Sequence, residues 1–124
     1  MSAENIFGLL PDGMDFPGFL AGVARLYPAV RFTYRPMLRT ERAALARRSD
    51  GMTGEEQVKG MAAELEKRIK SWDFPRPAKA DTFLRLTPAL FDRLFAIVVG
   101  DIPPDTDPAG ELAEKFDEAT AAKN

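Results

Sequence analysis

The sequence predicts a mainly helical α+β domain: a compact bundle of three to four helices, a small β-hairpin, an N-terminal arm and a C-terminal helix. Three observations support this fold class. An apolar stripe with helical spacing runs through residues 54–72, and residues 88–99 are apolar on most sides. Apolar and polar side chains alternate through residues 29–35, which is typical of a strand. The length of 124 residues fits one domain with a tail.

Composition shifts divide the chain into three parts. Residues 1–17 contain two prolines and two glycines among large apolar side chains, and they predict an irregular arm with apolar anchors. Residues 18–100 carry the periodic segments and form the single folded domain. Residues 101–124 begin with the acidic linker DIPPDTD and continue as a C-terminal helix whose only large anchors are Leu112 and Phe116.

The hairpin is expected from residues 19–25 and 29–35. In the second segment one face carries aromatic and β-branched residues and the other is charged or polar, the two sets being Val30, Phe32 and Tyr34 against Arg31, Thr33 and Arg35. Pro36 ends the strand because proline has no N–H for a ladder. Residues 19–25 alternate only weakly, so an antiparallel partner strand is the first choice and a short helix the second.

Two helices are expected next, over residues 38–48 and 54–72. Thr40 is the predicted N-cap of the first, with an acid in the first turn and two arginines in the last, as the helix dipole favours. Thr53 and Glu56 have the spacing of a capping box at the start of the second. Its apolar stripe predicts core residues at Val58, Met61, Leu65, Ile69 and Trp72.

The last helix of the domain, residues 88–99, is expected to be the most buried. Thr87 and Pro88 supply an N-cap and a proline at the first helical position, and Gly100 ends the helix. The predicted core residues are Leu90, Phe91, Leu94, Phe95 and Val98. Trp72 lies at the end of the preceding stripe and has two interpretations, a lid on the core against Phe74 and this helix, or an exposed anchor for a partner.

Charge is distributed unevenly along the chain, although the net charge is only −2. Residues 25–48 hold seven arginines against one glutamate, a balance of +6, and residues 101–124 hold seven acids against two lysines, a balance of −5. Three explanations are open: the acidic segment folds onto the basic one, copies associate head to tail as a homo-oligomer, or both surfaces are merely solvated. The candidate partner-binding residues are Arg31, Arg35, Arg39, Arg42, Leu112 and Phe116.

Several function classes are disfavoured by composition. The chain has no histidine and no cysteine, which removes the commonest proton-transfer group, a cysteine nucleophile and a Cys/His zinc site, so no enzyme activity and no cofactor are expected. DIPPDTD lacks the closing glutamate of a calcium loop. A pI of about 5.2 argues against nucleic acid as a partner. No apolar run is long enough to span a membrane, so a cytoplasmic protein is expected.

Three segments together resemble a known family. They are VRFTYRPMLRTERAAL (30–45), LEKRIKSWDF (65–74) and TFLRLTPALFDRLFAIVVGD (82–101). Their order is similar to that in the tail assembly chaperones of tailed bacteriophages and prophages, over roughly residues 19–101. The N-terminal arm is a departure from the family pattern.

The resemblance implies a non-catalytic helical protein in the cytoplasm of the host bacterium. It would bind the long tape-measure protein, keep it soluble and help tube subunits polymerise around it. The family has no catalytic residues to transfer to this sequence. Two alternatives stay open: a structural component of the tail or neck present in the virion, which the N-terminal arm favours, and a small protein- or DNA-binding regulator, which the arginine cluster favours.

Overall fold

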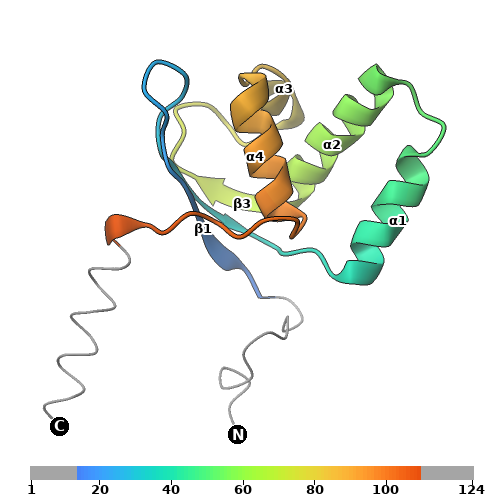
Figure 1. Cartoon of the computed structure of the whole chain (residues 1–124), viewed down its shortest axis with the longest axis horizontal. Helices are drawn as coiled ribbons and strands as arrows, with labels where there is room; N and C mark the ends of the chain where they lie inside the picture. The colour runs from blue at the N-terminus through green and yellow to red at the C-terminus, as the bar shows by residue number, and fades with distance from the viewer. Residues whose placement is uncertain (1–13, 110–124) are drawn as a thin grey trace, which may run out of the picture.

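The alternating segment around Phe32 forms the central strand of a three-stranded antiparallel sheet in the computed structural model, which describes residues 14–109 (Figure 1). Four helices accompany the sheet in this part of the chain, so the α+β class is confirmed. In chain order the elements are β1 (Phe16–Leu20), β2 (Val30–Tyr34), α1 (Arg39–Ser49), α2 (Gly54–Arg68), β3 (Ile69–Trp72), α3 (Ala80–Leu84) and α4 (Pro88–Val98).

The expected hairpin forms, but its first strand is displaced. β1 begins at Phe16, inside the predicted arm, and pairs with β2 from Phe16↔Tyr34 to Leu20↔Val30. The prediction of a strand over residues 19–25 is wrong, because the chain turns back on itself between Val23 and Tyr27, which form an isolated bridge. This small turn makes the connection between the strands longer than the sequence pattern suggests.

The long apolar stripe is divided between a helix and a strand. α2 ends at Arg68, and residues 69–72 form β3, so the prediction of one helix to residue 72 is wrong. Ile69 lies opposite Tyr34 and Trp72 lies opposite Phe32, so the backbone of β3 pairs with β2 in place of the hydrogen bonds that a further helical turn would form. The hairpin therefore becomes a three-stranded sheet, and the helices do not form a simple bundle.

The ends of the helices follow local side-chain chemistry. Thr53 and Glu56 form the expected capping box, in which the Glu56 backbone N–H donates to Thr53 Oγ1 and the Thr53 N–H donates to the Glu56 carboxylate. The predicted cap at Thr40 is wrong: the N-cap is Leu38, two residues earlier, and its N–H donates to the Glu41 carboxylate. After α4, Gly100 has a φ of 88°, a left-handed conformation that glycine adopts without strain.

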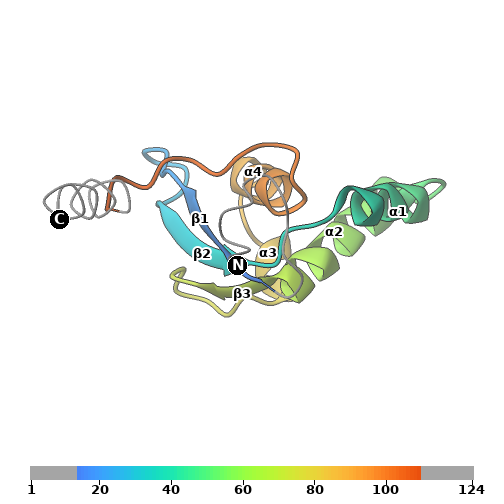
Figure 2. The same ribbon diagram turned by 90° about the horizontal axis from the view of Figure 1, so that it is seen from below.

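The core lies between the sheet and the helices, with α4 packed against it as the most apolar element (Figures 1 and 2). The prediction that Val58 belongs to the core is wrong, since 42% of this residue is exposed. Met61 is only partly buried. Trp72 is half-buried at the edge of the core, where its ring stacks on Phe74 at 4.9 Å between ring centres. The other predicted core residues are buried: Leu65, Ile69, Leu90, Phe91, Leu94, Phe95 and Val98.

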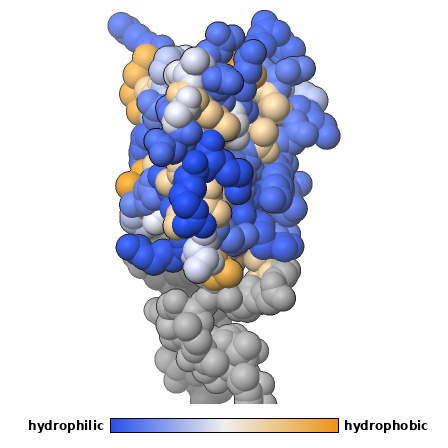
Figure 3. All heavy atoms as spheres, turned by 90° about the vertical axis from the view of Figure 1, so that its right-hand side faces the viewer, coloured by the Kyte–Doolittle hydropathy of each residue, from blue (hydrophilic) through white to orange (hydrophobic). Residues whose placement is uncertain are grey.

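The hairpin of α1 and α2 extends away from the sheet (Figure 2). Leu45 is the one buried residue of α1, as the thin apolar face of this helix suggests. The side of the molecule that carries α1 is mostly hydrophilic (Figure 3). Most of the predicted arm and most of the predicted C-terminal helix, including Leu112 and Phe116, lie outside the described residues.

Candidate functional site

Three of the four candidate arginines are held by aspartates of the same chain. Arg31 Nε and Nη2 donate to the Asp107 carboxylate at 2.8 and 3.0 Å. Arg42 donates twice to Asp101, at 3.3 and 3.2 Å, and Arg35 Nε donates to Asp15 at 3.1 Å. Arg39 is exposed at the start of α1 and makes no ion pair within residues 14–109. The structure therefore does not gather these arginines into an uncommitted basic surface.

The acidic linker folds onto the basic segment, which is the first of the three explanations for the charge asymmetry. Asp105 contacts the end of β1: its N–H donates to the carbonyl of Phe19, and its carboxylate accepts from the N–H of Ala21, both at 2.8 Å. Arg93 also donates to this carboxylate, at 2.8 Å. The Ala21 hydrogen bond and then Arg93 hold the pKa of Asp105 below its ordinary value.

Arg31 also covers an aromatic ring. The guanidinium carbon lies 5.0 Å from the ring centre of Phe19, its cross-strand neighbour on the side of the sheet that bears Thr33 and Ser71. Phe19 is only 7% exposed, although it lies on the side of the sheet away from the main core. Because Asp107 holds the guanidinium in place, the linker and Arg31 act as one cover over this ring.

A buried ion-pair cluster joins α1, α2 and the end of β2. Arg68 is 4% exposed and donates to the carboxylates of Glu64 and Glu41 and to the carbonyls of Arg35 and Pro36. Burial lowers the pKa of Arg68, but the hydrogen bonds that it donates to Glu64 and Glu41 outweigh burial and raise the pKa overall. In the sequence, the i,i+4 spacing of Glu64 and Arg68 on one helix indicates the ion pair between them. All the donors point inward, so this cluster stabilises the fold and is not a ligand site.

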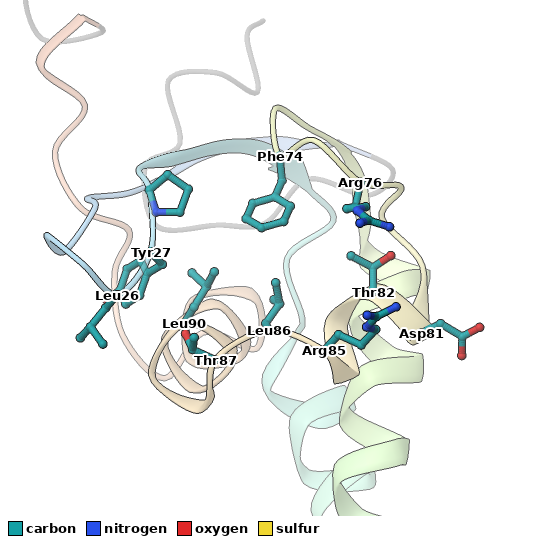
Figure 4. Close-up of a pocket in the computed structure, with 11 residues that line it drawn as sticks. Leu26, Tyr27, Phe74, Arg76, Asp81, Thr82, Arg85, Leu86, Thr87 and Leu90 are labelled. Carbon is teal, nitrogen blue, oxygen red and sulfur yellow. The ribbon is translucent and has the colours of Figure 1, made fainter.

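A cavity of about 340 Å³ lies between the β1–β2 connection, the segment after β3, and the region of α3 and α4. We call it the Leu26 cavity. Its apolar wall consists of Leu26, Tyr27, Pro28, Phe74, Leu86 and Leu90. Its polar rim consists of Arg76, Asp81, Thr82, Arg85 and Thr87. Figure 4 shows Leu26 and Tyr27 on one side and the two arginines on the opposite side.

The two rim arginines differ from those of the basic segment. Neither the Arg76 nor the Arg85 side chain makes an ion pair or hydrogen bond with any residue in the described part of the chain. Asp81, on the same side, points away from the centre of the cavity (Figure 4). The cavity therefore offers an apolar hollow beside two uncommitted cations, a combination suited to an apolar group with a carboxylate nearby.

Sequence reasoning did not identify this cavity. Phe74, Arg76 and Arg85 lie in the connecting segment 73–86, where apolar and basic residues alternate with prolines without a recognisable period. Leu26, more than forty residues away, lies in the turn between Val23 and Tyr27, just after the segment that the sequence predicted as the first strand. Only the fold brings these segments together. The exposure of Leu26, at 55%, was not readable from the sequence.

Residues 14–109 contain neither a metal-binding cluster nor a membrane-spanning helix. No group of three or more acidic side chains there is arranged to hold a metal ion. Within the same residues, no helix has the length and apolar character needed to cross a membrane. Comparison of the chain with protein-family models, with curated proteins and with solved structures found no match in any of the three.

Proposed function

We propose that this protein is a non-catalytic factor of bacteriophage tail morphogenesis that binds an apolar segment of the tape-measure protein in the Leu26 cavity. The observation that carries the proposal is the cavity itself: an open apolar hollow whose wall comes from three separate segments of the fold. The similarity of residues 19–101 to tail assembly chaperones supports the choice of partner. The resemblance implies a long hydrophobic tape-measure protein, which would need cover until the tube has formed around it.

The size and lining of the cavity favour a polypeptide segment. A volume of about 340 Å³ is at the small end of ligand pockets, which run from roughly 300 to 1,000 Å³, and suits one or two bulky side chains. Arg76 and Arg85 supply charge-assisted donors for carboxylates that flank those side chains. Such a site binds an apolar helix by its side chains and selects among helices by the acids beside them.

The paired arginines bear on the alternative of a DNA-binding regulator. That alternative relied on the arginine cluster, and Arg31, Arg35 and Arg42 are engaged by aspartates of the chain. A phosphate backbone would have to displace these carboxylates before it could use the cations. The contacts therefore favour a protein partner over a nucleic acid.

The test is co-expression with the tape-measure protein of the same phage or prophage. We expect that protein to stay soluble and to co-purify with the full chain. In L26E a carboxylate replaces an exposed wall residue, so we expect co-purification to fall about tenfold or more. L38E is the matched control, because Leu38 is similarly exposed, at 48% against 55%, and lies at the start of α1, outside the cavity.

Two results would count against the proposal. An insoluble tape-measure protein with no co-purifying chain would remove the chaperone function. Detection of the chain in purified virions by mass spectrometry, in amounts comparable to known tail proteins, would favour the structural alternative. Equal loss of co-purification in L26E and L38E would show that the cavity is not the binding site.

A further inference from the structure

Asp105, on the acidic linker, joins two parts of the fold that support the Leu26 cavity. On one side its N–H donates to the carbonyl of Phe19, and its carboxylate accepts from the N–H of Ala21, where the β1–β2 connection begins. On the other side the same carboxylate accepts from Arg93 Nη2 on α4, at 2.8 Å. Asp105 itself is not among the residues that line the cavity. Any effect that it has on the cavity therefore passes through these neighbours.

Arg93 extends the contact to the cavity wall. Besides Asp105, it is hydrogen-bonded to the side chain of Tyr27, which lines the cavity and is only 9% exposed (Figure 4). Leu90, one helical turn before Arg93 on α4, is another wall residue. The Arg93 and Asp105 side chains are 36% and 27% exposed, so solvent screens their attraction only in part. A continuous chain of contacts thus leads from the linker to the wall.

The turn that carries Leu26 is closed by its own backbone. The Val23 N–H donates to the carbonyl of Tyr27 at 2.9 Å, and the N–H groups of Leu26 and Tyr27 donate back to the carbonyl of Val23. At the base of the turn the two sides lie close together, since a Cβ on Gly22 would be 2.7 Å from the backbone nitrogen of Ala29. Because the turn is closed in this way, a restraint on Tyr27 also restrains Leu26.

We propose that Asp105 is a positioning residue of the Leu26 cavity, which acts through Arg93 to hold Tyr27 and Leu26 in the arrangement that binds a ligand. Because these contacts order the wall before a ligand arrives, binding does not carry the entropy cost of ordering it. The inference rests on the proposed function in that the cavity is a binding site. It does not depend on which protein supplies the bound segment.

The affinity of the cavity can be measured with a small fluorescent probe, 8-anilinonaphthalene-1-sulfonate. The probe combines aromatic rings with one sulfonate, which matches the apolar wall beside Arg76 and Arg85. Fluorescence titration of the full chain gives its Kd. We expect L26E to raise this Kd about tenfold and L38E to leave it unchanged. Absence of probe binding that is sensitive to L26E would overturn the proposal, because there would be no binding cavity to position.

D105N should raise the Kd of the probe about five- to tenfold. The amide oxygen can still accept the N–H of Ala21, whereas the charge that holds Arg93 is lost. D101N is the matched control, since Asp101 lies on the same linker and pairs with Arg42, away from the cavity. We expect its Kd to stay within about twofold of that of the natural chain. An unchanged Kd in D105N would overturn the proposal.

A double-mutant cycle with Y27F tests the route through Arg93. Y27F keeps the aromatic wall but removes the hydroxyl that Arg93 contacts, so it should raise the Kd by a similar factor. In this background D105N should have little further effect, because both changes interrupt one route. General destabilisation by D105N would instead weaken binding equally in both backgrounds, and this result would overturn the proposal. The expected cycle together with failed co-purification would remove the tape-measure assignment and leave the positioning role intact.

Discussion

Arg31 and Asp107 are joined by two hydrogen bonds, of 2.8 and 3.0 Å, although 76 residues separate them in the chain. The pair attaches the acidic linker to the sheet. It also holds the Arg31 guanidinium over Phe19. One contact therefore neutralises part of the basic segment and covers an aromatic ring on the outer side of the sheet.

Replacement of these two residues should have unequal effects on the free energy of unfolding. D107N removes the charge but leaves Arg31 near Phe19, whereas R31A removes the pair and uncovers the ring, so R31A should be the more destabilising. Urea unfolding followed by fluorescence of Trp72, the single tryptophan, measures both. The effect of D107N should shrink at about 1 M salt, where the Debye length is about 3 Å. Equal effects at all salt concentrations would contradict this account.

Arg68→Met should be strongly destabilising. The variant leaves Glu64 buried at 7% exposure and the carbonyls of Arg35 and Pro36 without their donor, and loss of one partner of a buried ion pair lowers the free energy of unfolding by about 3–5 kcal/mol. R48M is the control, because Arg48 also contacts Glu64 but its side chain is 59% exposed, and a change within about 0.5 kcal/mol is expected. Urea titration of both variants makes the comparison. Similar values for the two would show that burial of Arg68 is unimportant.

Gly18→Ala and Gly60→Ala should shift stability in opposite directions. A Cβ at Gly18 would lie 2.5 Å from a ring carbon of Phe32, which is 4% exposed and cannot move away freely, so a loss of about 1–3 kcal/mol is expected. Gly60 lies inside α2 with nothing within 4 Å of its Cβ position, and alanine there should add about 0.5–1 kcal/mol of helix stability. Thermal and urea unfolding are the measurements. A stabilised G18A would show that Phe32 does not pack on the glycine.

The domain should lose stability in acid because of three carboxylates. The pKa of Glu41 is lowered by the Leu38 N–H and by Arg68, that of Glu56 by the Thr53 N–H and hydroxyl, and that of Asp105 by the Ala21 N–H and Arg93. Since each folded pKa lies below its ordinary value, 4.5 for glutamate and 3.8 for aspartate, the unfolded chain binds protons first as pH falls. Their contribution is complete above those values and is lost as pH falls through the folded pKa values.

The midpoint of thermal unfolding, measured from about pH 7 down to about pH 2.5, checks this expectation. E41Q should lower the midpoint near neutral pH and make its decline in acid shallower, because the glutamine cannot contribute a proton-dependent hydrogen bond. Asp81, an exposed acid on α3 with no ion pair within residues 14–109, is the control position. A decline in D81N as shallow as that in E41Q would contradict the assignment.

Local chemistry determined much of the fold. The capping box of Thr53 and Glu56, the proline at the start of α4 and the alternation through β2 each depend on a few neighbouring residues, and each is found in the structure. The end of α2 could not be predicted in this way. Ile69 and Trp72 continue a helical stripe as well as they fit a strand, and the choice depends on β2 being available as a partner.

The candidate site shows the same division. The sequence by itself determined that a basic segment and an acidic segment exist and that no histidine or cysteine chemistry is available. Only the tertiary structure decided which charges meet, so that Arg31 and Arg42 are paired while Arg76 and Arg85 stay uncommitted within the described residues. The physical reason is that ion pairs and cavities form between side chains that are close in space. The path of the linker across β1 and the position of the turn at Leu26 both depend on contacts between residues far apart in the sequence.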